Sequence, residues 1–200
     1  MSLDALKRMA TRAIDEIPRS LRIQKIPDIL PDTTGKNEFK LAISGYCQAD
    51  TYSCGAIAGW SVLEHFNPKV KFRAFYDACA PAPDSGTSTT RLMKALRKHG
   101  VAVSDRKDLD FDGIQQCLRD GKPILVSIAG NSLFDDEAGH WVAIYGFGRK
   151  PNRIFICGKT RPGFSRQEMT WKQFKAIWNP LGEGLVCSPK RIRESVTSLI

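Results

Sequence analysis

The chain has 200 residues, of which 42% are hydrophobic and 26% charged, with a formal net charge of +9. This size and composition are typical of one ordinary globular domain, and no stretch reaches the roughly 18 consecutive apolar residues that a membrane helix needs. Residues 1–16 mix acids and bases with apolar residues and lack the apolar core of a signal peptide, so we expect a cytoplasmic protein.

The first half of the chain is predicted to be mainly helical, because its apolar residues recur at helical spacing. A loop-rich connection over residues 19–40, with two prolines and a glycine, separates the first helix from the others. The helices are expected over residues 3–17, 54–66, 72–79 and 88–99.

The second half is predicted to consist mainly of antiparallel strands. In chain order we expect a strand at 101–103, a helix at 111–119, strands at 123–129, 140–147, 153–157 and 164–169, a helix ending at 178, and an edge strand at 185–188. The turn at Pro151-Asn152 makes a hairpin of the two strands beside it. Thr170 and Gln173 form the capping-box pattern that opens the last helix. Helices followed by antiparallel strands indicate an α+β domain.

The chain divides into three parts. We expect an N-terminal helix and loop-rich extension over residues 1–40, a globular domain over 41–190 and a C-terminal tail over 191–200.

Six cysteines are present, but none has the paired spacing of a metal site. A chain of this size needs no disulfide staples, and we expect several of the thiols to be small buried apolar groups. Neither a metal nor an organic cofactor is expected. The cysteines stand at positions 47, 54, 79, 117, 157 and 187.

The positive charge is concentrated in residues 149–193, which hold eleven basic and two acidic residues and so supply the whole net charge. Such a segment can face an acidic partner, for example a nucleic acid or an anionic protein. Because no nucleic-acid-binding motif accompanies the charge, a solvated basic face is the simpler interpretation, and nucleic acid is not the expected partner. A nucleic-acid-associated protein stays open as an alternative that rests on this segment alone.

A cysteine stands where a polar loop gives way to a long apolar helix. The segment reads Gln48-Ala-Asp-Thr-Tyr-Ser-Cys54-Gly55. Unpaired N–H groups and the positive end of the helix dipole stabilise a thiolate at such a position. Gly55 lets a substrate approach the backbone closely, and the side-chain amide of Gln48 can join the backbone N–H of Cys54 in an oxyanion hole.

His140 is the first residue of a predicted buried strand, HWVAIYGF. At a junction of loop and strand, a base can reach a cleft while the strand fixes its backbone. His140 would accept the proton of Cys54 and later protonate a leaving group. The other two histidines, His65 and His99, lie at predicted helix ends and are assigned surface or capping roles.

Together these motifs resemble those of papain-like cysteine peptidases, most closely the compact bacterial group that includes the double-glycine leader peptidases (peptidase family C39). The resemblance extends from about residue 41 to residue 178. It implies a papain-like fold, in which a nucleophile at a helix N-terminus packs on an antiparallel sheet from the second half of the chain. It further implies Cys54 as nucleophile, His140 as general base, Gln48 as oxyanion donor and a peptide or protein substrate.

One position departs from the family's pattern. The Asp or Asn that orients the imidazole is expected after strand 153–157, where Gly158 stands. The nearest amide in sequence, Asn152, falls in the hairpin turn. The third member therefore stays open between these positions, and a Cys–His dyad is the remaining interpretation.

The leading hypothesis is a thiol hydrolase of the cysteine peptidase kind, acting on a peptide or amide bond. Two alternatives share the fold. One is a papain-like binding or regulatory module that has lost catalysis. The other is a thiol acyltransferase, which passes the acyl group to an acceptor other than water, or a deamidase, which acts on a side-chain amide.

Overall fold

The computed structural model describes residues 37–46, 50–129, 139–158, 166–179 and 181–190. The helix expected over residues 3–17, most of the N-terminal extension and the C-terminal tail lie outside the described residues. The expected domain boundary at residue 41 falls immediately after β1 (Glu38–Lys40), which pairs with β4 and so belongs to the sheet.

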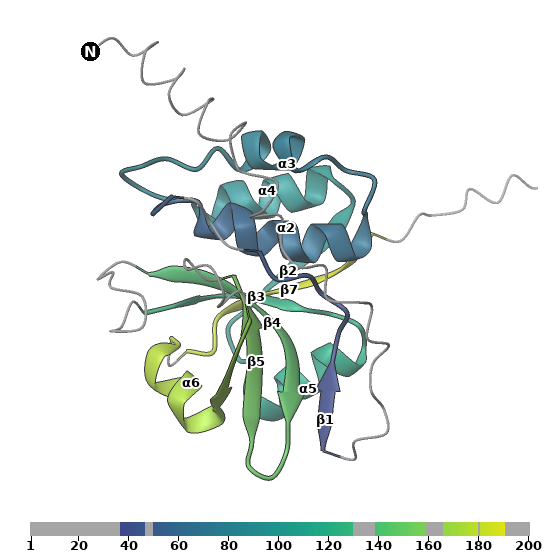
Figure 1. The fold of residues 1–200 in the computed structure, drawn as a ribbon, viewed down its shortest axis with the longest axis vertical. Helices are drawn as coiled ribbons and strands as arrows, with labels where there is room; N and C mark the ends of the chain where they lie inside the picture. Colours follow the sequence, from purple (N-terminus) through teal and green to yellow (C-terminus); the bar gives the residue numbers. More distant parts are fainter. Residues whose placement is uncertain (1–36, 47–49, 130–138, 159–165, 180, 191–200) are drawn as a thin grey trace, which may run out of the picture.

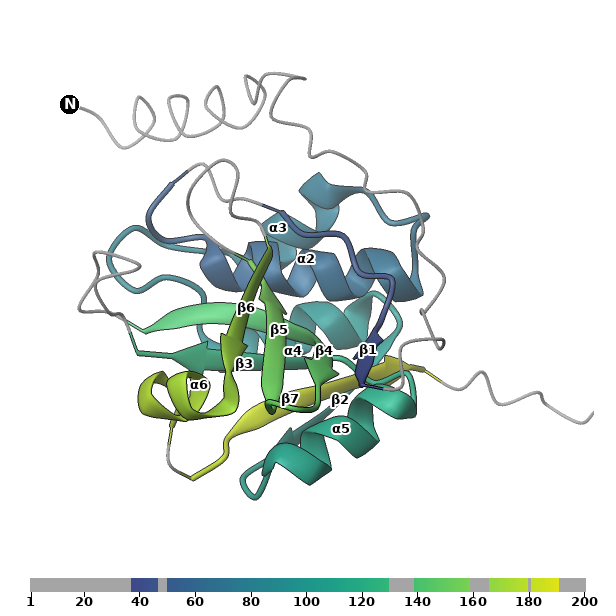
Figure 2. The ribbon, with the colours of Figure 1, turned by 60° about the horizontal axis from the view of Figure 1, so that its bottom comes forward.

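Seven strands of the described chain form one sheet with helices on both sides (Figure 1). On one side lie α2, α3 and α4, with α2 against the sheet, and on the other lie α5 and α6 (Figure 2). The helices are α2 (Cys54–Phe66), α3 (Phe72–Cys79), α4 (Thr89–Lys98), α5 (Phe111–Arg119) and α6 (Trp171–Ile177). The strands after β1 are β2 (Val101–Arg106), β3 (Ile124–Ile128), β4 (His140–Gly148), β5 (Arg153–Cys157), β6 (Arg166–Thr170) and β7 (Gly184–Pro189).

The alternation of side chains along the strands produces two hydrophobic cores, one on each face of the sheet. Leu125 of β3 and Ala143 of β4 pack with α2, α3 and α4. Their neighbours Ile124 and Ile144 pack with α5 and α6 on the opposite face. This double covering explains why β3 and β4 read as nearly continuous apolar runs.

The strand order is β2-β7-β3-β4-β5-β6, and each pair is antiparallel. The expected hairpin is confirmed by the pairing of β4 with β5. The first half of β4 pairs with β3, and β1 pairs with its end at residues 146–148. This arrangement gives β4 a central position and leaves His140 at the end of the strand where the chain enters it.

Two expectations about strands were wrong. The strand predicted at the edge, β7, lies between β2 and β3, because residues 184–189 pair with β2 and residues 185–186 also pair with β3. The edge position belongs to β2. The three residues of β1 were not predicted, because so short a run carries no recognisable period.

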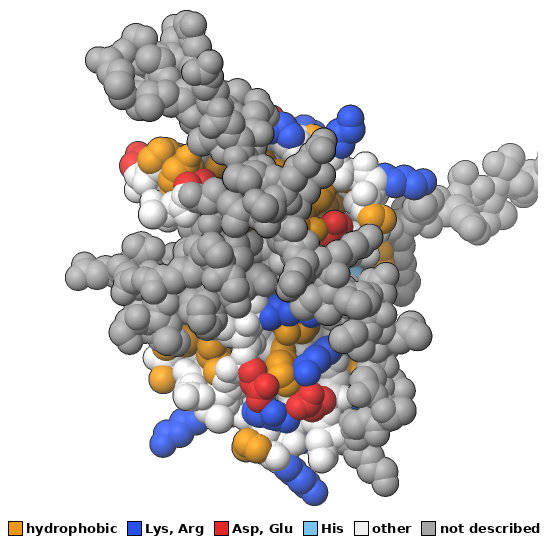
Figure 3. Space-filling model, viewed as in Figure 1, with side chains coloured by type: hydrophobic (Ala, Val, Ile, Leu, Met, Phe, Trp, Pro, Cys, Tyr) orange, Lys and Arg blue, Asp and Glu red, His pale blue; other side chains and the backbone are white. Residues whose placement is uncertain are grey.

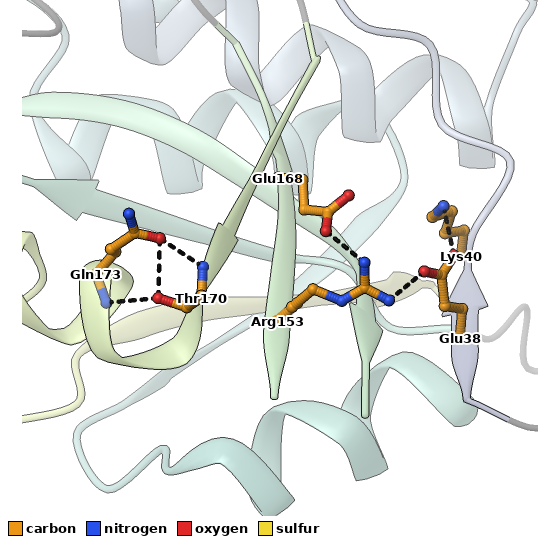
Figure 4. A network of polar contacts seen from close by, with 6 residues as sticks. All are labelled: Glu38, Lys40, Arg153, Glu168, Thr170 and Gln173. Atoms are coloured by element: carbon orange, nitrogen blue, oxygen red, sulfur yellow. Dashed lines mark hydrogen bonds and ion pairs between the residues drawn. The ribbon is translucent and has the colours of Figure 1, made fainter. Parts of the chain in front are cut away.

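The capping box expected at the start of α6 is confirmed. The backbone N–H of Gln173 donates to Thr170 Oγ1 over 3.2 Å, and the backbone N–H of Thr170 donates to Gln173 Oε1 over 2.9 Å (Figure 4). These two bonds satisfy donors at both ends of the first turn and fix where the helix begins.

The basic segment uses several of its charges inside the domain. Arg153 on β5 bonds both Glu38 on β1 and Glu168 on β6 (Figure 4). Arg149 donates to the side chain of Gln115, and Arg166 donates to the carbonyl of Ile43. In Figure 3, acidic and basic side chains lie together over the lower part of the face in view. An acidic partner for residues 149–193 stays a prediction.

Candidate active site

The nucleophile candidate Cys54 is the first residue of α2, as the sequence predicts. The first ten residues of the helix, Cys54 to Leu63, are all buried, so packing against the sheet and the neighbouring helices holds this end in place. Ser53 is the N-cap but its side chain makes no capping hydrogen bond, and the first turn contains no acidic residue. The N–H groups at this helix start therefore face the thiol without a competing side-chain cap.

His140 is the first residue of β4 and is 3% exposed. Its Nε2 lies 2.8 Å from the carbonyl oxygen of Gly158. A carbonyl oxygen only accepts hydrogen bonds, so Nε2 carries the proton and donates it to this bond. In the neutral ring Nδ1 is then the unprotonated, basic nitrogen.

The structure brings the head of α2 and the start of β4 together. The backbone of Trp141, the residue after His140, lies near enough to the Cys54 sulfur to act on the pKa of this thiol, in the direction that lowers it. A Cβ placed on Gly55 would lie 2.7 Å from Thr87 Cβ and 3.0 Å from Trp141 Cδ1. Only glycine permits α2 to approach β4 this closely, which gives Gly55 a structural role at the site.

The electrostatics of Cys54 favour the thiol in the resting state. Burial raises the pKa of Cys54, and the charge of Asp50 raises it further. Hydrogen bonds from the backbone N–H groups of Trp141, Gly55 and Cys54 itself lower the pKa, but the net direction is upward. Ionisation of this sulfur therefore needs a proton acceptor.

Gly158 stands at the end of β5 with φ of +116°, a backbone conformation that favours glycine. At this position, where the family's pattern has an orienting side chain, the main chain aims a carbonyl at His140. The sequence does not reveal a backbone acceptor at this position, because the family's pattern has a side chain there.

Asn152 is not brought to the site. It lies in the turn between β4 and β5, at the opposite end of the hairpin from His140. Gly148 lies eight residues after His140 along β4, which is roughly 26 Å at the usual rise of a strand. The Asn152 carbonyl accepts a bond from the backbone N–H of Trp171 over 2.8 Å, as a turn residue does. The weak candidacy of Asn152 as third member was therefore wrong.

Gln48 lies outside the described residues, so its oxyanion role stays a prediction. Asp50, in the same loop, was not singled out from the sequence. Its carboxylate accepts hydrogen bonds from the backbone N–H groups of Tyr52 and Ser53. Its position in the loop could have indicated these bonds, because an Asp side chain commonly accepts hydrogen bonds from backbone N–H groups a few residues later.

Within the described parts of the chain, no group of three or more His, Cys, Asp or Glu side chains could hold a metal ion, and no helix is long and apolar enough to span a bilayer. The described cysteines are free thiols, and all but Cys117 are buried. A cavity of about 550 Å³ lies between α5, β2 and β7, on the face of the sheet opposite α2 and therefore away from Cys54.

Comparison with known families identifies the chain. Residues 44–191 match the model of the peptidase C39 family. The chain belongs to the peptidase C39 family. The family resemblance and the papain-like α+β fold expected from the motifs are thereby confirmed. No curated protein matches the sequence significantly.

Solved C39 structures share this fold. The peptidase domain of Streptococcus ComA, a bi-functional ABC transporter, aligns with a TM-score of 0.56 at 18% identity, over 72% of this chain and 96% of the other. A double-glycine-motif protease from an AMS/PCAT transporter aligns with a TM-score of 0.58 at 17% identity, over 76% and 94%. A putative C39-like peptidase from Bacillus anthracis aligns with a TM-score of 0.52 at 9% identity, over 70% and 90%. At these identities the likeness concerns the fold alone.

Proposed function

We propose that this chain is a cysteine peptidase-like thiol hydrolase that cleaves a peptide or amide bond, with Cys54 as nucleophile and His140 as general base. The observation that supports the proposal is the close approach of the start of α2 to the start of β4, where a Cβ on Gly55 would lie 3.0 Å from Trp141 Cδ1. The first residue of β4 is His140, whose Nε2 bonds the Gly158 carbonyl, and the proposal is that its Nδ1 reaches the Cys54 thiol.

The chemistry begins with a neutral thiol and a neutral imidazole. Nδ1 of His140 accepts the thiol proton as the sulfur attacks the carbonyl carbon of the substrate. The imidazolium then returns this proton to the leaving amine as the C–N bond breaks, and a thioester remains on Cys54. Water attacks the thioester with His140 as base, the acyl group leaves as an acid, and the thiol regains its proton.

The head of α2 supplies the stabilisation of negative charge. The backbone N–H of Cys54 and the positive end of the helix dipole act on the oxyanion that forms next to the sulfur. The side-chain amide of Gln48 is the second donor in this proposal, on the strength of the family resemblance.

The carbonyl of Gly158 takes the orienting role that an Asp or Asn has in the family's pattern. It selects the tautomer with Nε2 protonated, which is the tautomer that leaves Nδ1 basic. A carbonyl is neutral and gives the imidazolium less stabilisation than a carboxylate would. We therefore expect slower turnover than with an ionised third member.

A peptide or protein is the proposed substrate. One protease of the same fold was solved in complex with its leader peptide, which supports peptide binding by this architecture. The same thioester would serve an acyltransferase if an amine or thiol replaced water, and a deamidase if the substrate were a side-chain amide.

A binding module without catalysis is the second candidate. Two observations favour it: the orienting group is an uncharged carbonyl, and the net pKa of Cys54 is raised. Such a module would keep the peptide-binding surface and lose the acyl transfer.

A panel of peptidyl acyloxymethyl ketones distinguishes the two, because these probes occupy a substrate site and alkylate only an activated thiol. We expect labelling at Cys54, mapped by mass spectrometry, that is absent from Cys54→Ala and slower by about 100-fold or more in His140→Ala. Cys117→Ser is the matched control and should label as the wild type does, because this half-buried thiol lies across the sheet. Equal labelling of wild type and His140→Ala would refute the hydrolase, and unlabelled wild type with peptide binding would support the module.

A further inference from the structure

Asp50 makes several hydrogen bonds in the described part of the loop that leads into α2. Its Oδ1 accepts hydrogen bonds from the backbone N–H groups of Tyr52, at 2.9 Å, and Ser53, at 2.7 Å. Its Oδ2 accepts a longer bond, 3.4 Å, from the hydroxyl of Tyr76 on α3. One carboxylate thus ties together the two residues before the nucleophile and connects them to a neighbouring helix.

These bonds fix the start of α2 from outside the helix. An ordinary N-cap side chain accepts from the second or third N–H of its helix, here Gly55 or Ala56. The Ser53 side chain makes no such bond, and the backbone of Gly55 acts to lower the pKa of Cys54. Asp50 therefore orders the entry to the helix and leaves the first-turn donors to the reacting atoms.

The charge of Asp50 does not help a thiolate. It raises the pKa of Cys54, which opposes ionisation. It also raises the pKa of Tyr76, although burial is the larger cause there. The hydrogen bonds, and not the negative charge, are thus what the carboxylate offers to the site.

We propose that Asp50 is a positioning residue, whose Oδ1 holds Tyr52 and Ser53 so that α2 presents Cys54 together with uncapped N–H groups. This inference rests on the proposed function, which it deepens by adding a residue that acts through the loop and not on the substrate. The carboxylate acts through the hydrogen bonds that Oδ1 accepts and through its negative charge. Different substitutions test these two effects.

Three variants test the proposal. Asp50→Asn keeps an oxygen acceptor for both N–H groups and removes the charge, so we expect ketone labelling within about threefold of wild type. The midpoint of iodoacetamide alkylation against pH should move to lower pH in this variant, since the opposing charge is gone. Asp50→Ala removes the acceptor, and we expect labelling slower by about 10- to 100-fold. Tyr76→Phe removes the hydroxyl that bonds Oδ2 and leaves both backbone bonds to Oδ1 in place, so it should label within about threefold of wild type.

Amide hydrogen exchange over residues 50–54 supplies a readout that does not depend on activity. We expect faster exchange in Asp50→Ala and wild-type exchange in Asp50→Asn, with both variants folded by near-ultraviolet circular dichroism. Wild-type labelling and exchange in Asp50→Ala would overturn the proposal, as would an equal loss in all three variants. If wild type itself is not labelled, the proposed function fails, and the exchange data still decide the role of Asp50.

Discussion

The backbone of Gly158 offers the sharpest test of the site, because a single methyl group perturbs it. Substitution to Ala introduces a Cβ that would lie 3.4 Å from both Ala58 Cβ and the Trp141 carbonyl oxygen, so there is room for it. The φ of +116° is instead the difficulty, since an L side chain in so sparsely populated a region costs about 1 to 3 kcal/mol.

Relaxation of that strain rotates the Gly158 peptide and moves its carbonyl away from His140 Nε2. A hydrogen bond to a charged group contributes about 1.5 to 3 kcal/mol, so its loss in the imidazolium state corresponds to about 10- to 150-fold in rate. We expect Gly158→Ala to label with the peptidyl ketones more slowly by this factor.

Gly121→Ala is the matched control. Gly121 also has a positive φ, +73°, with nothing within 4 Å of a Cβ, and it lies in the turn after α5. Both variants should lose thermal stability, measured by calorimetry, but only Gly158→Ala should lose labelling. A Gly158→Ala protein that melts early and labels at the wild-type rate would refute the role given to this carbonyl.

Three further predictions follow from packing and ionisation. Gly55→Ala places a Cβ 2.7 Å from Thr87 Cβ, so we expect the free energy of unfolding to fall by about 1 to 3 kcal/mol and labelling to be lost. Denaturant titration measures this loss, and wild-type stability would contradict the close packing at Gly55. In His140→Ala, burial still raises the pKa of Cys54 and no imidazole accepts its proton, so the pH midpoint of iodoacetamide alkylation should lie above that of an ordinary thiol. A pH midpoint below that of the wild type would be inconsistent with His140 as base. Burial also raises three thiol pKa values from 9.0 to about 12, those of Cys79, Cys157 and Cys187. These folded-state pKa values exceed the unfolded ones, so the contribution of the protonated thiols to the free energy of unfolding is fully present below pH 9.0 and is lost as the pH rises toward 12. Urea titrations should therefore show a free energy of unfolding that falls over this interval. A constant value would contradict the prediction.

Local signals in the sequence predicted the helices well. The start of α2 at Cys54 and the capping box of α6 were predicted to the residue, because a helix start depends on a few neighbouring side chains. The position of β7 was wrong, because the pairing of strands is a tertiary property that a short apolar run does not encode.

For the candidate site, the sequence predicted the elements on which its residues stand, and the catalytic roles stay a proposal. Cys54 and His140 stand at element boundaries that the sequence reveals, and the structure brings those boundaries together. The acceptor for His140 could not be predicted, because it is a main-chain oxygen whose direction depends on the left-handed φ of Gly158. Asp50 could have been found from its place in the loop, but only the coordinates show which N–H groups it binds.

Nitrogen-15 chemical shifts of the His140 ring, recorded in wild type and in Cys54→Ala, test the central claim most directly. We expect a neutral ring protonated at Nε2, with an Nδ1 resonance that changes when the thiol is removed and an Nε2 resonance that does not. A ring protonated at Nδ1, or an Nδ1 resonance that is the same in both proteins, would contradict it.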